Sequence, residues 1–135
     1  MNKFLKEIIE QPDAIDNTLE YYIGSDGKKK LEQLKKRVES DNFEQIIFTG
    51  MGSSYFASHA ASTLFNSTGI SSFSINSSEL LHYNMCLLKK KTLLIGFSQS
   101  GESFEVKELL RTMPAGVFCA GITNEAKSTL ARNSD

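Results

Sequence analysis

The stretch KTLLIGFSQSGES, residues 91–103, decides the fold. It opens with an apolar run that is typical of a strand buried on both faces of a sheet. The run ends in a turn rich in serine and glycine, and the residues from about Ser103 to Thr112 then have the spacing of a helix. A buried strand, a glycine-containing turn and a helix in this order predict one unit of an α/β protein.

The same order of elements occurs elsewhere in the chain. An apolar strand followed by Gly50-Met51-Gly52 precedes a predicted helix that is rich in alanine. Alternation of this kind predicts a parallel sheet with right-handed crossovers, in a three-layer, flavodoxin-like α/β domain of strand order 2-1-3-4. The remaining elements that we predict are strands over residues 45–49, 72–75 and 116–122 and a helix over residues 53–66.

The first 41 residues have a different, purely helical pattern. One helix is predicted to stop before Pro12, a second to run from about Asp13 to Gly24-Ser25-Asp26-Gly27, and a third to cover residues 28–40. We therefore expect a helical lead-in over residues 1–41 and an α/β domain over residues 42–135.

Composition excludes several classes of function. A net charge of −1 gives no electrostatic basis for binding nucleic acid or an anionic membrane. No apolar run approaches the roughly 20 residues that span a bilayer, and the N-terminus does not have the pattern of a signal peptide, so we expect a cytoplasmic protein. Cys86 and Cys119 lack the spacing of metal ligands and are interpreted as free thiols; no metal and no cofactor is expected.

Two turns carry the candidate site. In an open parallel sheet, ligands bind outside the carboxyl ends of the strands, where the strand order reverses. The turns after the first and third strands flank that point, and each opens a helix whose N-terminus favours an anion. Their glycines allow close approach of the backbone, and their serines add hydroxyl donors. The candidate substrate-binding residues are Gly52, Ser53, Ser54, Ser98, Gln99, Ser100 and Ser103, and the hydroxyls of Ser54, Ser98, Ser100 and Ser103 are the candidate donors to a phosphate.

Two alternatives compete with a phosphate site. Ser53 or Ser103, taken alone, is well explained as a helix N-cap, but one cap needs one hydroxyl and these turns provide many. A dinucleotide site would need a third glycine where Tyr55 stands and an acidic residue after the second strand, where the chain has Ile75-Asn76. The phosphate interpretation accounts for more of the pattern.

Four stretches together resemble the sugar isomerase (SIS) domain family, above all the isomerase half of glucosamine-fructose-6-phosphate aminotransferase and the fructosamine 6-phosphate deglycases. The segment from Glu10 to Leu19 resembles the family's lead-in helix, and Gly52-Ser53-Ser54-Tyr55 resembles its GTSY turn. Ser78-Glu79-Leu80 resembles its SEF string. The segment from Ser98 to Ser103 resembles SQSGET almost letter for letter.

The resemblance implies a role for each matching residue. Ser54, Ser98, Gln99, Ser100 and Ser103 would bind the phosphate of a sugar 6-phosphate, and Ser53 with the backbone near Met51 would contact the sugar. The aminotransferase has cysteine where this chain has Met51, which affects the finer specificity for the sugar.

The resemblance also implies that parts of an active enzyme are missing. Members of the family that are active carry two SIS domains, and this chain is expected to stop before the fifth strand of the first, without the second domain or its catalytic residues. The fourth strand, with Val117, Phe118 and Ile122, is then an uncovered edge that invites pairing. We therefore expect a homo-oligomer or a fragment of a longer protein.

Glu79 and His82 are the acid–base candidates near the predicted crevice, and catalysis by this chain would depend on Glu79 as the base. Asn76-Ser77-Ser78-Glu79 also fits a capping box, with Asn76 as the cap and Glu79 reaching back. His59 and His82 are best explained by local packing. Three functions remain: a phosphosugar-binding domain without its catalytic half, an isomerase completed by oligomerisation with Glu79 as base, and a module that senses phosphosugars.

Overall fold

The computed structural model describes residues 2–134 of the chain. These residues form two compact units, divided between Asp41 and Asn42, and each unit is described by itself.

The first unit consists of three helices: α1 (Lys3–Ile9), α2 (Gln11–Ile23) and α3 (Ser25–Asp41). Pro12 stands in the first turn of α2, where its missing amide costs nothing. Our prediction that residues 24–27 form a break was wrong in part, because α3 begins at Ser25 and contains Gly27. A Cβ at Gly27 would lie 2.8 Å from the Tyr21 carbonyl carbon, so glycine serves there to let α2 and α3 approach.

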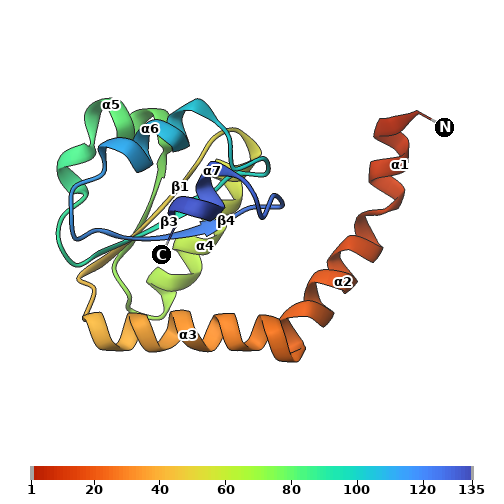
Figure 1. Cartoon of the computed structure of the whole chain (residues 1–135), viewed down its shortest axis with the longest axis horizontal. Coiled ribbons are helices and arrows are strands. Elements are labelled where there is room, and N and C mark those ends of the chain that lie inside the picture. Colours follow the sequence, from red (N-terminus) through yellow and green to blue (C-terminus); the bar gives the residue numbers. More distant parts are fainter. Residues whose placement is uncertain (1, 135) are drawn as a thin grey trace. The chain divides into compact units, whose positions relative to one another are not determined.

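The second unit is built on a four-stranded parallel sheet of order β2-β1-β3-β4, as predicted. In Figure 1 the strands run side by side through the middle of this unit. β3 pairs with both β1 and β4, so the strand within residues 91–103 is central. The strands are β1 (Gln45–Gly50), β2 (Ser72–Asn76), β3 (Thr92–Phe97) and β4 (Phe118–Ile122).

Helices cover both faces of this sheet and make the three layers that the sequence predicts. α4 lies on one side, and α5 and α6 lie on the other (Figure 1). α5, α7 and the short 3-10 helix η1 were not among the predicted elements, although a capping box was predicted where α5 begins. The elements are α4 (Ser53–Ser67), α5 (Ser77–Tyr83), η1 (Met85–Leu87), α6 (Phe104–Thr112) and α7 (Thr129–Asn133).

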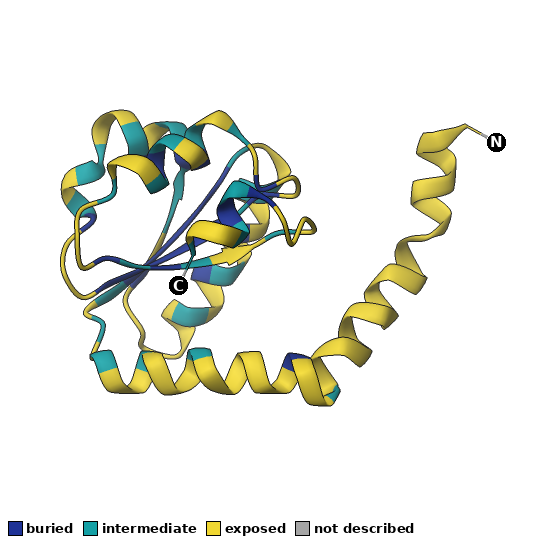
Figure 2. Cartoon of the chain, viewed as in Figure 1, coloured by how far each residue is buried: buried dark blue, intermediate teal, exposed yellow. Residues whose placement is uncertain are grey.

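Alternation along the strands assigns their side chains to two cores. Ile47, Leu94 and Cys119 are in register across three strands and pack with Leu80 of α5 and Leu109 of α6. The next residue of β1, Phe48, points to the opposite face, where its ring lies 5.4 Å from that of Phe65 in α4. Figure 2 shows the middle of the sheet buried, where β1 and β3 lie, and the outer helix surfaces exposed.

β4 is shorter than the strand predicted over residues 116–122, so fewer residues lie on the edge of the sheet that was predicted to be uncovered. Val117 lies before this strand and is buried, so it does not belong to the exposed edge, whereas Ile122 is exposed. Gly116, with a φ of 91°, and the bond from the Val117 amide to the Pro114 carbonyl form a turn that delays the strand.

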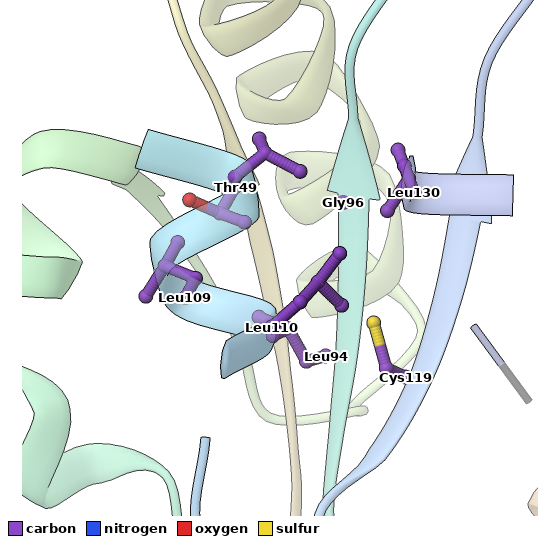
Figure 3. Close-up of a pocket in the computed structure, with 8 residues that line it drawn as sticks. Thr49, Leu94, Gly96, Leu109, Leu110, Cys119 and Leu130 are labelled. Atoms are coloured by element: carbon purple, nitrogen blue, oxygen red, sulfur yellow. The ribbon is translucent and has the colours of Figure 1, made fainter. Parts of the chain in front are cut away.

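α7 packs over a part of the sheet that carries no side chains. Leu130 of α7 is buried, and a Cβ at Gly121 would lie 2.8 Å from Leu130 Cγ. Figure 3 shows Leu130 beside Gly96 of β3, and both residues line a cavity of about 10 Å³. The cavity is lined by apolar side chains of β3, β4, α6 and α7, with Thr49 at one side. The two glycines therefore allow α7 to lie close against the sheet.

Among residues 2–134, every helix is too short or too polar to cross a membrane.

A buried hydroxyl pair joins β1 to α5. Thr49 Oγ1 and Ser77 Oγ lie 2.9 Å apart, and both residues are almost completely buried. This bond fixes the start of α5 against the carboxyl end of β1.

Replacement of one partner should therefore cost more than replacement of both. Thr49→Val leaves the Ser77 hydroxyl buried without its partner, which we expect to lower the free energy of unfolding by about 1–3 kcal/mol. In the double variant that also carries Ser77→Ala, most of the lost stability should be recovered, because no unpaired hydroxyl is then buried. Urea denaturation is measured on the wild type, on Thr49→Val, on Ser77→Ala and on the double variant, and Thr63→Val, at an exposed threonine of α4, is the control. Simple additivity of the two single losses would contradict the pairing.

Candidate functional site

The carboxyl ends of the four strands form one row. Gly50 of β1 is in register with Asn76 of β2 and with Phe97 of β3, and Phe97 is in register with Ile122 of β4. Paired strands lie about 4.8 Å apart. The turns that leave β1 and β3 are therefore neighbours at the edge where the strand order reverses.

The first turn enters α4 through two glycines with different tasks. A Cβ at Gly50 would lie 3.0 Å from the Ser54 Cβ, so the absence of a side chain lets α4 start directly against the strand. Gly52 has a φ of 53° and faces open space. Ser53 and Ser54 follow as the first residues of α4, and among the described residues neither hydroxyl has a hydrogen-bond partner.

The second turn is held from within by Ser98. This serine is 7% exposed, its amide donates to the Ile122 carbonyl at 3.1 Å, and its hydroxyl accepts from the Gly101 amide at 3.1 Å. The hydroxyl of Ser100 accepts from the Glu102 amide at 3.2 Å, and the hydroxyl of Ser103 lies 3.4 Å from that of Ser98. The turn thus gathers three hydroxyls, and each keeps at least one lone pair or its proton for a ligand.

Neither of the two long helices at this edge is capped by a side chain. Gly52 is the N-cap residue of α4, and Ser103 is that of α6 but makes no side-chain cap bond. The alternative that the Ser53 or Ser103 hydroxyl caps its helix is therefore wrong. α5 and α7, in contrast, are capped by the side chains of Asn76 and Ser128.

Main-chain donors remain free at both turns. Within residues 2–134, the amides of Gly52, Gln99 and Ser100 have no acceptor. The first amides of α6 also lack one, because an N-terminal turn has no preceding carbonyls and Ser103 does not cap it. Together with the helix dipoles, these amides make a surface that suits an anion.

Glu102, the acidic residue of the second turn, is directed to α7. The Thr129 amide donates to Glu102 Oε1 at 2.6 Å, and the Thr129 hydroxyl lies 3.0 Å from both carboxylate oxygens. Lys107 Nζ lies 3.5 Å from Oε2. The bonds from Thr129 and then the Lys107 charge lower the pKa of Glu102.

Residues 123–130, which we call the brace, support the second turn along its length. The Asn124 amide donates to the Gln99 carbonyl and the Leu130 amide to the Gly101 carbonyl, each at 3.1 Å. The Thr123 hydroxyl also donates to the Gln99 carbonyl. Sequence reasoning missed the brace, because no local pattern in residues 123–130 indicates which turn they contact.

The acid–base candidates are exposed. Asn76 accepts a hydrogen bond from the Ser78 amide at 3.0 Å, so half of the predicted capping box is confirmed. The Glu79 carboxylate does not complete it and has no partner among the described residues. His59 and His82 lie on α4 and α5, and each ring lies beside a tyrosine, Tyr55 and Tyr83 respectively.

The cavity of Figure 3 is separate from these turns. It lies between β3, α6 and α7, and the hydroxyl of Thr49, the polar residue that lines it, is paired with Ser77, so the cavity is poorly suited to a phosphate. Residues 2–134 also contain no cluster of three or more side chains suited to a metal ion.

An open parallel sheet of order 2-1-3-4 with helices on both faces defines a class of three-layer α/β domains whose ligand sites lie at the switch point of the strand order. Residues 42–135 match the SIS domain family, and the chain belongs to that family. As predicted from the sequence, its relatives include isomerizing aminotransferases, and they also include arabinose 5-phosphate isomerases.

One relative is a glutamine–fructose-6-phosphate aminotransferase (isomerizing) of Sulfurisphaera tokodaii, 34% identical over 97% of this chain and 21% of its own. Another is the arabinose 5-phosphate isomerase KpsF of Escherichia coli, 29% identical over 92% of this chain and 45% of its own. The chain thus spans about a fifth of the first and less than half of the second. A protein of E. coli CFT073, solved in complex with a sugar-phosphate ligand, matches all of this chain and 72% of its own, with 26% identity and a TM-score of 0.77.

Gly101 lies against the brace, whereas Gly69, which also has a positive φ, has open space around it. Gly101 and Gly69 both have positive φ, 62° and 84°. A Cβ at Gly101 would lie 2.5 Å from the Ser128 Cβ and 2.9 Å from Thr123 Oγ1, whereas a Cβ at Gly69 would meet nothing within 4 Å.

We expect Gly101→Ala to destabilise the protein more than Gly69→Ala does. The control carries only the backbone cost of a left-handed residue, about 1–2 kcal/mol. Gly101→Ala adds an overlap that displaces the brace, so its urea midpoint should fall further below that of the wild type. Equal losses in the two variants would contradict the close contact.

Proposed function

We propose that residues 42–135 bind the phosphate of a phosphorylated sugar, with Ser98, Ser100 and Ser103 at the centre of the site. The observation that carries the proposal is the absence of side-chain caps on α4 and α6, the two helices that begin at neighbouring strand ends. Ser54 and Gln99 complete the set of phosphate ligands, Ser53 contacts the sugar, and Gly52 allows the phosphate to approach the backbone.

Neutral donors are sufficient for this task. A hydrogen bond to a charged group contributes about 1.5–3 kcal/mol, and the two turns offer several free amides and hydroxyls. Two helix N-termini add favourable partial charges. This supports a site that holds a phosphate dianion without a dedicated lysine or arginine.

The relatives indicate which sugars to test. The aminotransferase is named for fructose 6-phosphate and KpsF for arabinose 5-phosphate, and the solved E. coli protein holds a sugar phosphate. We therefore propose an open-chain or cyclic sugar phosphate of five or six carbons as the ligand, in an aminotransferase-like isomerase or a deglycase. In this proposal the described residues supply binding, and the groups that move protons lie elsewhere.

An isomerase activity of the chain itself would need Glu79. Its carboxylate is free of partners among the described residues, and α5 begins at the same sheet edge as the two turns. Aldose–ketose interconversion moves a proton between adjacent carbons and needs such a base. Turnover that disappears in Glu79→Gln while binding persists would favour this second function over binding alone.

The binding proposal predicts a ligand preference that depends on the phosphate. Thermal unfolding should shift upward with fructose 6-phosphate and arabinose 5-phosphate, because a ligand that binds only the folded state stabilises it. Plain fructose and arabinose should give no shift. Ser100→Ala should reduce the shift, since it removes one donor from the second turn.

Ser71→Ala is the matched control, because Ser71 is exposed and precedes β2 at the opposite end of that strand. It should behave as the wild type. An equal response of wild type to phosphorylated and plain sugars would contradict the site.

We also propose that the chain self-associates through α1 and α2. Neither helix has a buried residue, yet both carry large apolar side chains. Along α2, Ile15, Leu19 and Ile23 are exposed at helical spacing on one face. Burial of each such side chain contributes roughly 1.5–3 kcal/mol, and we propose that the same helices of a second copy of the chain supply the apolar surface that buries them.

Sedimentation velocity can test this proposal. The pair Ile15→Gln and Leu19→Gln should shift the wild-type oligomer toward monomer, because it removes apolar surface and leaves helix propensity nearly unchanged. Asp16→Gln with Glu20→Gln has the same spacing on a neighbouring face of α2 and should leave the oligomer intact. A wild-type chain that stays monomeric at high concentration would overturn the proposal.

A further inference from the structure

Glu102 is a carboxylate inside a turn that is otherwise built to attract an anion. Like charges near each other disfavour the charged form of both groups. Its negative charge therefore opposes phosphate binding unless the side chain is held away from the ligand and performs a task there.

Glu102 links the second turn to α7 through contacts of both its side chain and its backbone. Its carboxylate accepts two bonds from Thr129 of α7, while its own amide donates to the Ser100 hydroxyl. One residue thus connects a proposed phosphate ligand to α7. The Leu130 amide, bonded to the Gly101 carbonyl, makes a second connection one residue earlier in the turn.

We call the hydrogen bonds from the Thr129 amide and hydroxyl to the Glu102 carboxylate the clasp. We propose that Glu102 is a positioning residue and that the clasp keeps residues 98–103 in the conformation that presents their hydroxyls and amides to a phosphate. This inference rests on the proposed phosphate site and adds a residue that does not itself touch the ligand. The physical reason is preorganisation: a turn that is ordered before binding loses less conformational entropy when the ligand arrives.

If the clasp positions the turn, removal of the Glu102 side chain should weaken phosphate binding, whereas charge repulsion alone predicts that it should strengthen binding. If the Glu102 charge acted only by repulsion, its removal would tighten phosphate binding. If Glu102 served only to stabilise α7, its removal would lower the melting temperature and leave the affinity of the folded protein unchanged. A positioning role weakens binding in a protein that remains folded.

The experiment measures the Kd for fructose 6-phosphate by isothermal titration calorimetry, at a temperature well below the melting of every variant. Glu102→Ala and Thr129→Val should each weaken binding about tenfold. Thr129→Val keeps the amide and removes the hydroxyl of the clasp, so it serves where Glu102→Ala does not fold. Thr129→Ser restores the hydroxyl and should return the Kd to within about twofold of the wild type.

Glu125→Ala is the matched control. It removes one negative charge from the brace itself, at an exposed residue whose side chain has no partner among the described residues. Its Kd should equal that of the wild type. Unchanged or tighter binding in Glu102→Ala and Thr129→Val would overturn the inference.

Failure of the proposed function gives a different result. If the wild type itself binds neither fructose 6-phosphate nor arabinose 5-phosphate, the phosphate site is wrong, and the positioning role falls with it. If the wild type binds and all variants match it, the phosphate site stands and only the positioning role is wrong. Amide hydrogen exchange of residues 98–103 should rise in Thr129→Val and not in Thr129→Ser, which shows whether the clasp orders the turn.

Discussion

The parallel pairing of β1 with β3 is the constraint on which the rest of the second unit depends. Its last register pair joins Gly50 to Phe97, so the two turns that follow leave the sheet from adjacent strands in the same direction. Right-handed crossovers then send α4 to one face of the sheet and α6 to the other. The two helix N-termini converge at one edge as a consequence of strand order, and the proposed site needs no special fold beyond that.

Close approach at a few glycines turns this arrangement into a defined site. Gly50 brings α4 onto the end of β1, and Gly101 allows Ser128 of the brace to lie against the second turn. Leu130 fills the space above Gly121 in the same way. Serines occupy the surface that remains, because a hydroxyl can rotate to donate or to accept at an edge where main-chain amides already point outward.

The sequence predicted the sheet order, the helices on both faces and the position of both turns, because these depend on local periodicity and on a general rule of chain handedness. It failed at Gly27, where a glycine expected to end a helix serves instead as a contact point between two helices. It also did not predict α7 or the role of Glu102. The role of Glu102 depends on a contact with a residue 27 positions further along the chain, and no pattern within a short window indicates that Thr129 lies against Glu102.

A site made of neutral donors has a consequence for the acidic residue within it. Lysine or arginine attracts any anion over several ångströms, whereas amides and hydroxyls bind only an oxygen that lies along their direction. The affinity of such a site for phosphate then depends on the conformation of its backbone. Glu102 fixes that conformation, and in our proposal this gain in affinity exceeds the loss from the repulsion between its negative charge and the phosphate. Thr129 and Lys107 together compensate that charge. The acidic residue of the SQSGES segment is thereby compatible with an anion site, because its charge is compensated on the side of the turn that faces α7.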